Sequence, residues 1–183
     1  LLTFFTNANL RLNGGLGNDN ILANGATFDG GAGDDFLTGG PNNDIMTGNL
    51  AGGADDDTFV GGGGTDNVGG GGTLTGDTIL VAGTSGADSI NLSLSATGQL
   101  IATVNGVTTT YNNFTGGPIA TAGIDQILVQ AQNGNDGLTV NSANGALPLL
   151  ITYDGGAYTH DHLTISLTAA QAANGAVQAD LAA

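Results

Sequence analysis

Residues 30–68 read GGAGDDFLTGGPNNDIMTGNLAGGADDDTFVGGGGTDNV, and this stretch decides the expected fold. It contains four copies of one pattern: two glycines, a short spacer, an aspartate at the sixth place and an apolar residue at the eighth. Another full copy precedes it at 14–21, and two looser copies follow at 83–90 and 131–138. One such turn cannot bury its apolar residue alone, so stacked copies are expected to share a thin core.

The glycines of the pattern indicate a special backbone shape. At the first, second and fourth places they are expected to supply positive φ, which residues with a side chain avoid. Where the fourth place is not glycine it is Asn42 or Asp55, and these residue types tolerate the left-handed region best. The sixth-place aspartate then places a carboxylate beside exposed backbone carbonyls. Those oxygen atoms are the ligands that Ca²⁺ prefers.

The pattern resembles the RTX (hemolysin-type) calcium-binding nonapeptide, G-G-x-G-x-D-x-U-x, which winds a parallel β-roll. The resemblance implies that Ca²⁺ is bound between stacked turns by backbone and carboxylate oxygens. The candidate metal-binding residues are Asp19, Gly31, Gly33, Asp35, Gly40, Asn42, Asp44, Gly53, Asp55, Asp57, Gly62, Gly64, Asp66 and Asp88.

Composition favours the same class. All 16 acidic residues are Asp, Arg11 is the only cationic residue apart from two His, and the formal net charge of −15 opposes compaction unless counter-ions neutralise it. We therefore expect bound cations and no nucleic-acid partner, since almost no group here can neutralise phosphates. The absence of Cys excludes disulfides and thiol chemistry. The scarcity of strong helix formers beside recurring Thr, Val and Ile predicts an all-β chain.

Spacing predicts how the copies stack. Copies that begin at 30 and 52, at 39 and 61, and at 61 and 83 are each 22 residues apart. We expect Asp35 and Asp57 on one edge of the solenoid and Asp44, Asp66 and Asp88 on the other. A coil of two nonapeptides has about 18 residues, so the chain departs from the family pattern and some sites are expected to be incomplete.

The repeat texture changes near residue 80. We predict an RTX-like β-roll over 1–80, a degenerate continuation of the solenoid over 81–168, and an Ala-rich terminal segment over 169–183. Asn105-Gly106 is a strong hairpin signal, so a hairpin over 99–111 is expected to project from the second half. The rival interpretation makes the second half a separate β-sandwich.

Catalytic signatures are absent from the sequence. The serines have no G-x-S-x-G context, and the glycine runs have no Lys for a phosphate loop. His160 and His162 flank Asp161 without a visible third ligand, so we interpret them as surface residues.

The sequence therefore predicts a secreted or cell-surface calcium-binding structural β-solenoid, not an enzyme and without a membrane span. We expect a filament, surface-layer or adhesin component that associates end to end or with neighbouring solenoid repeats. The alternative is a calcium-dependent folding and secretion module of a larger RTX enzyme or toxin. An ice-binding solenoid is disfavoured because the third, fifth and seventh places are too mixed.

Overall fold

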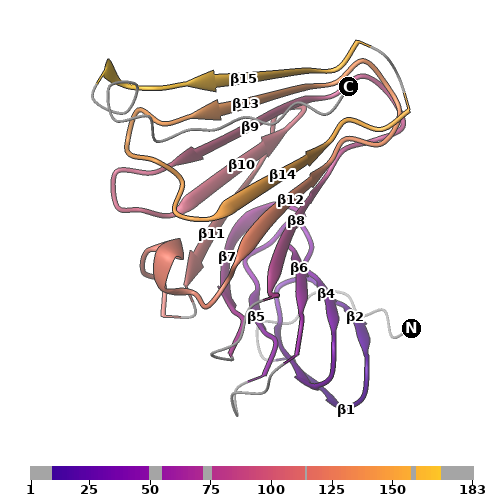
Figure 1. The fold of residues 1–183 in the computed structure, drawn as a ribbon. Helices are drawn as coiled ribbons and strands as arrows, with labels where there is room; N and C mark the ends of the chain where they lie inside the picture. Colours follow the sequence, from indigo (N-terminus) through magenta and orange to yellow (C-terminus); the bar gives the residue numbers. More distant parts are fainter. Residues whose placement is uncertain (1–9, 50–54, 72–75, 114, 158–159, 170–183) are drawn as a thin grey trace.

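The computed structural model describes residues 10–49, 55–71, 76–113, 115–157 and 160–169. These residues form an all-β fold in which successive strands alternate between two largely parallel sheets, except that the three consecutive strands within residues 89–113 all lie in the same sheet (Figure 1). The six-stranded sheet contains, in spatial order, β14 (Leu150–Asp154), β12 (Gln126–Gln130), β8 (Thr78–Ala82), β6 (Thr58–Val60), β4 (Phe36–Thr38) and β2 (Asn20–Leu22). The nine-stranded sheet contains β1 (Arg11–Leu16), β3 (Thr27–Ala32), β5 (Ile45–Thr47), β7 (Gly64–Gly69), β11 (Val107–Asn113), β10 (Leu100–Val104), β9 (Ser89–Leu94), β13 (Gly137–Asn141) and β15 (His162–Ser166).

The coils before residue 80 are thin. Strands β2, β4, β5 and β6 have three residues each, so only the middle side chain points into the solenoid. That residue is the eighth-place residue of the repeat, and Leu37, Met46 and Phe59 are fully buried there. The expectation that eighth-place residues build a thin core is confirmed by their burial.

The coils after residue 80 are wider. Strands β8, β9, β12 and β13 have five or six residues and alternate buried with partly exposed positions. Strand β9, for example, buries Ile90, Leu92 and Leu94 on one face. The six-stranded sheet runs from the first half into the second, because β8 pairs in parallel with both β6 and β12. The nine-stranded sheet continues through the parallel pairing of β7 with β11.

The segment around Asn105-Gly106 does not project from the solenoid, contrary to our expectation. Strands β10 and β11 pair antiparallel and lie within the nine-stranded sheet, between β7 and β9. Asn105 (φ 51°) and Gly106 (φ 85°) both have positive φ, as a tight turn between twisted strands requires. The insertion adds two strands to one sheet and none to the other. The strands of the two sheets accordingly meet at the turns after β8, β12 and β14 and spread apart away from them (Figure 1).

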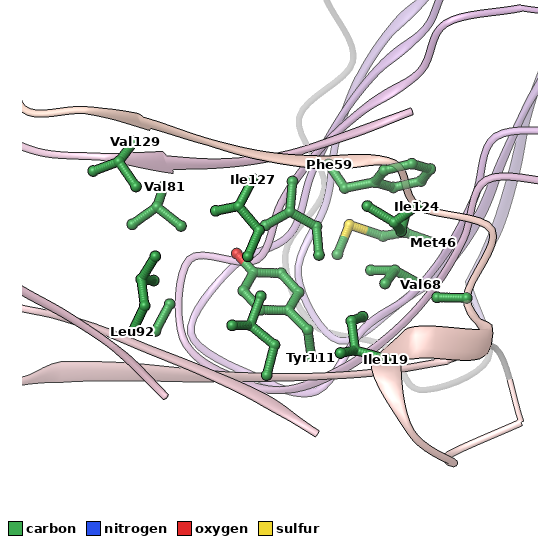
Figure 2. Close-up of a cluster of buried hydrophobic side chains, with 14 of the residues drawn as sticks. Met46, Phe59, Val68, Val81, Leu92, Tyr111, Ile119, Ile124, Ile127 and Val129 are labelled. Carbon is green, nitrogen blue, oxygen red and sulfur yellow. The ribbon is translucent and has the colours of Figure 1, made fainter. Parts of the chain in front are cut away.

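One hydrophobic cluster spans both halves of the chain. Figure 2 shows Met46, Phe59 and Val68, which precede residue 80, beside Ile124 and Ile127, which follow it. The 3₁₀ helix η1 (Ile119–Thr121) contributes the fully buried Ile119 next to Tyr111 (Figure 2). Among the described residues, no helix is long and apolar enough to cross a membrane.

Candidate functional site

Sixth-place aspartates stack along the edge where the chain passes from the nine-stranded to the six-stranded sheet, which we call the first edge. The backbone N–H of Asp19 donates to Asp35 Oδ1 (2.8 Å), and that of Asp35 donates to Asp57 Oδ1 (2.9 Å). Asp57 donates in the same way to Asp77 Oδ1 (2.9 Å), whose own N–H donates to Asp125 Oδ2 (3.2 Å). The first-edge column therefore contains Asp19, Asp35, Asp57, Asp77 and Asp125, and it places Asp35 beside Asp57 as their 22-residue spacing predicted.

The opposite edge, which we call the second edge, carries two shorter columns. The N–H of Ala26 donates to Asp44 Oδ1 and that of Asp44 to Asp66 Oδ1, both at 2.9 Å. The N–H of Asp88 donates to Asp136 Oδ1 (2.7 Å), and that of Asp136 donates to Asp161 Oδ1 (2.8 Å). Asp88 lies on the second edge with Asp44 and Asp66, as predicted, but it is not next to Asp66, because β10 and β11 lie between β7 and β9.

Neutral side chains occupy both sides of that interruption. Tyr111 is in register with Asp66, and its hydroxyl accepts the N–H of Gly61 (3.0 Å). On the other side, Asn105 Oδ1 accepts the N–H of Ser89 (2.9 Å), and Asn105 Nδ2 donates to Asp88 Oδ1. The hairpin therefore ends one column with a phenol and begins the next with an amide.

A second ladder, made by fifth-place residues, runs in the opposite direction. The N–H of Asp34 donates to Asn18 Oδ1 (3.2 Å), and that of Asp56 donates to Asp34 Oδ1 (3.1 Å). On the second edge, the N–H of Thr65 donates to Asn43 Oδ1 (2.9 Å). Neighbouring coils are thus joined by two opposed side-chain bonds at each of these turns. Sequence reasoning missed this role, although the first four full copies have Asn or Asp at the fifth place.

The second oxygen of the column carboxylates is the unusual feature of the site. Oδ2 of Asp19, Asp35, Asp57, Asp66 and Asp136, together with Oδ1 of Asp55, is buried without a hydrogen-bond partner. The side chains of Asp35, Asp57, Asp66 and Asp136 are at most 2% exposed. A buried carboxylate oxygen without a donor is costly unless it binds a proton or a cation.

The carboxyl groups respond to this environment with raised pKa values. Burial raises the pKa of Asp66 to about 8, that of Asp57 to about 7 and that of Asp77 to about 6. It also raises the pKa of Asp35 and Asp44. Neighbouring carboxylates add to the increase at Asp35 and Asp57, whereas hydrogen bonds from backbone N–H groups act against it. These groups therefore favour either a proton or a positively charged ligand.

The first-place glycines lie against the same oxygens. A Cβ at Gly30 would overlap Asp35 Oδ2, and one at Gly39 would lie 2.7 Å from Asp44 Oδ2. None of Gly14, Gly30, Gly39 and Gly61 has positive φ, so the expectation that the first place needs unusual φ is wrong. Glycine stands there because the carboxylate of its own turn leaves no room for a side chain.

The second and fourth places follow the backbone expectation in part. Gly31, Gly33, Gly62 and Gly64 have φ of 109°, 112°, 83° and 79°. Gly40 and Asn42 do not have positive φ, which corrects the interpretation of Asn42 as a left-handed substitute for glycine. Their N–H groups donate instead to Asp44 Oδ2 and Asn24 Oδ1, both at 3.0 Å.

The copy assigned to residues 52–59 begins earlier in the structure. A Cβ at Gly48 would overlap Asp57 Oδ2, so Gly48 has the position that the other first-place glycines have. Gly53, a predicted metal-binding residue, lies outside the described residues. Asp77 was missed because it stands seven positions after Gly70 and not five, although Gly70-Gly71 and Ile79 mark the same turn. Asp125 lacks the paired glycines altogether, so only the fold identifies it.

The described residues contain no group of three or more His, Cys, Asp or Glu side chains arranged to hold a metal ion. His160 and His162 do not form such a group with Asp161. A cation at these turns would therefore depend on one or two carboxylates and on backbone carbonyls.

Comparisons with known proteins found no match to the chain among family models, curated proteins or solved structures.

Proposed function

We propose that this chain is a calcium-ordered structural β-solenoid. The observation that carries the proposal is the row of buried carboxylate oxygens without hydrogen-bond donors, in particular Oδ2 of Asp35 and Asp57 on adjacent coils. Ca²⁺ takes six to eight oxygen ligands from carboxylates, backbone carbonyls and water in flexible geometry, at about 2.3–2.6 Å. Each donorless carboxylate oxygen would supply one such ligand.

The columns differ in how readily they would accept an ion. Asp19, Asp35, Asp57, Asp66 and Asp136 each offer a buried oxygen with no donor. In contrast, Asp44 Oδ2 accepts the N–H of Gly40 (3.0 Å), and Asp88 Oδ2 accepts that of Thr84 (2.7 Å). An ion at Asp44 or Asp88 would have to displace a hydrogen bond, so we expect those turns to bind more weakly.

The proposed role has no chemical step. Bound Ca²⁺ neutralises the acidic columns, joins neighbouring coils and makes binding free energy part of the folding free energy. Millimolar Ca²⁺ outside cells suits weak and repeated carboxylate sites, which favours a secreted or cell-surface location.

We propose that the chain associates end to end, either with further copies of itself or with neighbouring solenoid repeats. Among the described residues, the last strands β14 and β15 and the first strands β1 and β2 each pair on one side only. Leu150, on β14, is 67% exposed. Unpaired sheet edges with exposed apolar side chains favour the addition of further strands. The solenoid would then form part of a filament, surface layer or adhesin.

Circular dichroism with and without chelator tests calcium ordering. We expect EDTA to remove most of the β-structure signal from the purified chain and millimolar Ca²⁺ to restore it. A chain that stays fully folded in EDTA would contradict the proposal. Calcium-dependent polymers in electron micrographs would support end-to-end association separately.

A further inference from the structure

The coil formed by β14 and β15 is less well buried than the coil before it. It lies at the opposite end of the solenoid from β1 and β2 (Figure 1). Ile151 is in parallel register with the fully buried Ile127 but is itself only partly buried. Leu163 stands in the same relation to the fully buried Leu138. The inward side of this coil is therefore an incomplete part of the hydrophobic core.

The two ends of the solenoid differ in how many apolar side chains they turn inward. β14 and β15 supply two each, namely Ile151, Tyr153, Leu163 and Ile165. At the other end β1 and β2 supply one each, Leu12 and Ile21. In a head-to-tail contact, the smaller set would leave about half of the larger set uncovered. A second β14–β15 end presents an equal number of side chains.

Strand length also separates the two ends. β14 and β15 have five residues each, whereas β2 has three. Among the described residues, all of these strands pair on one side only. Very short edge strands hinder the addition of another strand, so the β14–β15 end is the better template for pairing.

The β14–β15 end is suited to pairing with a copy of itself. Thr152 is the middle residue of β14, and Thr164 is the middle residue of β15. A two-fold axis through these two residues pairs each strand antiparallel with the same strand of the partner. Ile151 then lies opposite the partner's Tyr153, because antiparallel strands place residues directly across from one another. Closed two-fold dimers are the commonest homo-oligomers.

The same rotation keeps the acidic turns of the two copies apart. It exchanges the first and second edges, so the turn that contains Asp161 lies beside the partner's turn over 142–149. Residues 142–149 include no charged side chain. The contact therefore avoids placing one Asp161 turn on another, which matters for a chain with a formal net charge of −15.

We propose that the chain forms a two-fold dimer in which β14 and β15 each pair antiparallel with the same strand of a second copy. The inference deepens the proposed end-to-end association and rests on it. The inward side chains of the two end coils complete each other's core. Any longer assembly is then built from such pairs.

Cysteine cross-linking in millimolar Ca²⁺ tests this geometry on the full chain, which has no Cys of its own. In T164C, two thiols meet on the axis with Cα atoms about 4.5–5.5 Å apart, within the range of a disulfide. T139C is the matched control, because Thr139 is in register with Thr164 on the next strand. Its two copies would lie three strand spacings apart, about 14 Å, which is too far for a disulfide.

We expect mild oxidation to convert T164C to a covalent dimer on a non-reducing gel and to leave T139C monomeric. T152C, with L128C as its in-register control, repeats the test on β14 if T164C does not fold. Equal cross-linking of a variant and its control would overturn the inference.

Sedimentation velocity of the unsubstituted chain gives a second readout. We expect species at even multiples of 17.8 kDa, with the dimer first. Head-to-tail growth would instead populate trimers, and abundant trimers would overturn the inference while leaving end-to-end association in place. A chain that stays monomeric would overturn both. Neither result bears on calcium ordering, which circular dichroism tests separately.

Discussion

The coils before residue 80 and the coils after it are joined to their neighbours by different interactions. In the first half, the strands of the six-stranded sheet before β8 have three residues each, β4 and β6 bury one side chain each, and two opposed ladders of Asp and Asn side chains link successive turns. In the second half, β9, β11 and β12 have five to seven residues and bury two or three side chains each. On its second edge, a short column that runs from Asp88 to Asp136 to Asp161 links the turns.

The comparison shows that a solenoid can exchange apolar burial for polar ladders along its length. A full-sized apolar side chain contributes about 1.5–3 kcal/mol when buried, so a coil with one inward residue needs another source of stability. Aspartate columns supply it only if their charge is neutralised, because buried carboxylates repel one another and are costly to desolvate. The first half should therefore depend on cations and the second half on packing.

Removing calcium should produce the largest difference between the halves. We expect chelator to abolish hydrogen-exchange protection at Phe59 and Val68, whose coils depend on the columns, and to leave more protection at Val129 and Val140. Residue-resolved hydrogen exchange in EDTA measures this directly. Equal loss of protection in both halves would show that the chain is one cooperative unit and would break the comparison.

Acidification should partly replace calcium. Burial raises the pKa of Asp57 to about 7 and that of Asp66 to about 8, above the unfolded value of about 3.9. The folded state therefore binds protons more tightly than the unfolded state, and the metal-free chain should gain stability as pH falls from above 8 towards 4. Urea midpoints of metal-free protein at pH 8, 6.5 and 5 should increase in that order. D66N should reduce the change of the urea midpoint with pH. A midpoint of the unsubstituted protein that falls on acidification would contradict this prediction.

Matched leucine truncations compare the two kinds of core. Leu37 on β4 and Leu92 on β9 are both fully buried, but Leu37 is the only inward residue of its strand. Leu-to-Ala changes in cores cost about 2–5 kcal/mol, depending on how far the surroundings collapse. We expect the loss of stability for Leu37→Ala to lie near the upper end of this range, because the ladders hold its turns apart. The loss for Leu92→Ala should lie near the lower end. Denaturant unfolding in saturating Ca²⁺ measures both, and a larger loss for Leu92→Ala would reverse the interpretation.

Two glycines test the close contact between successive coils. Gly15 and Gly31 have nearly the same φ, 106° and 109°, but only Gly31 has a neighbour where a Cβ would be placed. Gly15→Ala should cost about 1–2 kcal/mol of backbone strain. Gly31→Ala should cost about 1–3 kcal/mol more, because its Cβ would overlap the carbonyl oxygen of Gly15. Thermal unfolding measures both variants, and an equal loss of stability in Gly15→Ala and Gly31→Ala would show that the coils can separate freely.

The sequence predicted the local elements of the fold well. The eighth-place residues Leu37, Met46 and Phe59 are buried, and the 22-residue spacing correctly paired Asp35 with Asp57 and Asp44 with Asp66. These predictions succeeded because each follows from a contact between turns of equivalent sequence. The spacing also placed Asp88 on the edge that carries Asp66, but the two are not neighbours, because two strands from residues 100–113 enter the sheet between them, which the repeat cannot indicate.

The candidate site was predicted less completely. Asp77 and Asp125 belong to the first-edge column, but their turns do not have the regular repeat spacing. Asn42 was assigned a backbone role, whereas its N–H donates to Asn24 on the neighbouring coil. Whether calcium occupies these turns stays a prediction.

The sequence by itself determined the kind of turn, the inward residue of each coil and the placement of acid along the two edges. Those properties depend on residues within one repeat, where glycine, aspartate and an apolar residue act over a few positions. Only the tertiary structure decided which carboxylates are neighbours, where the hairpin interrupts a column and which oxygens are left without a donor. Those properties depend on how distant coils stack, and stacking is set by the whole sheet and not by any single turn.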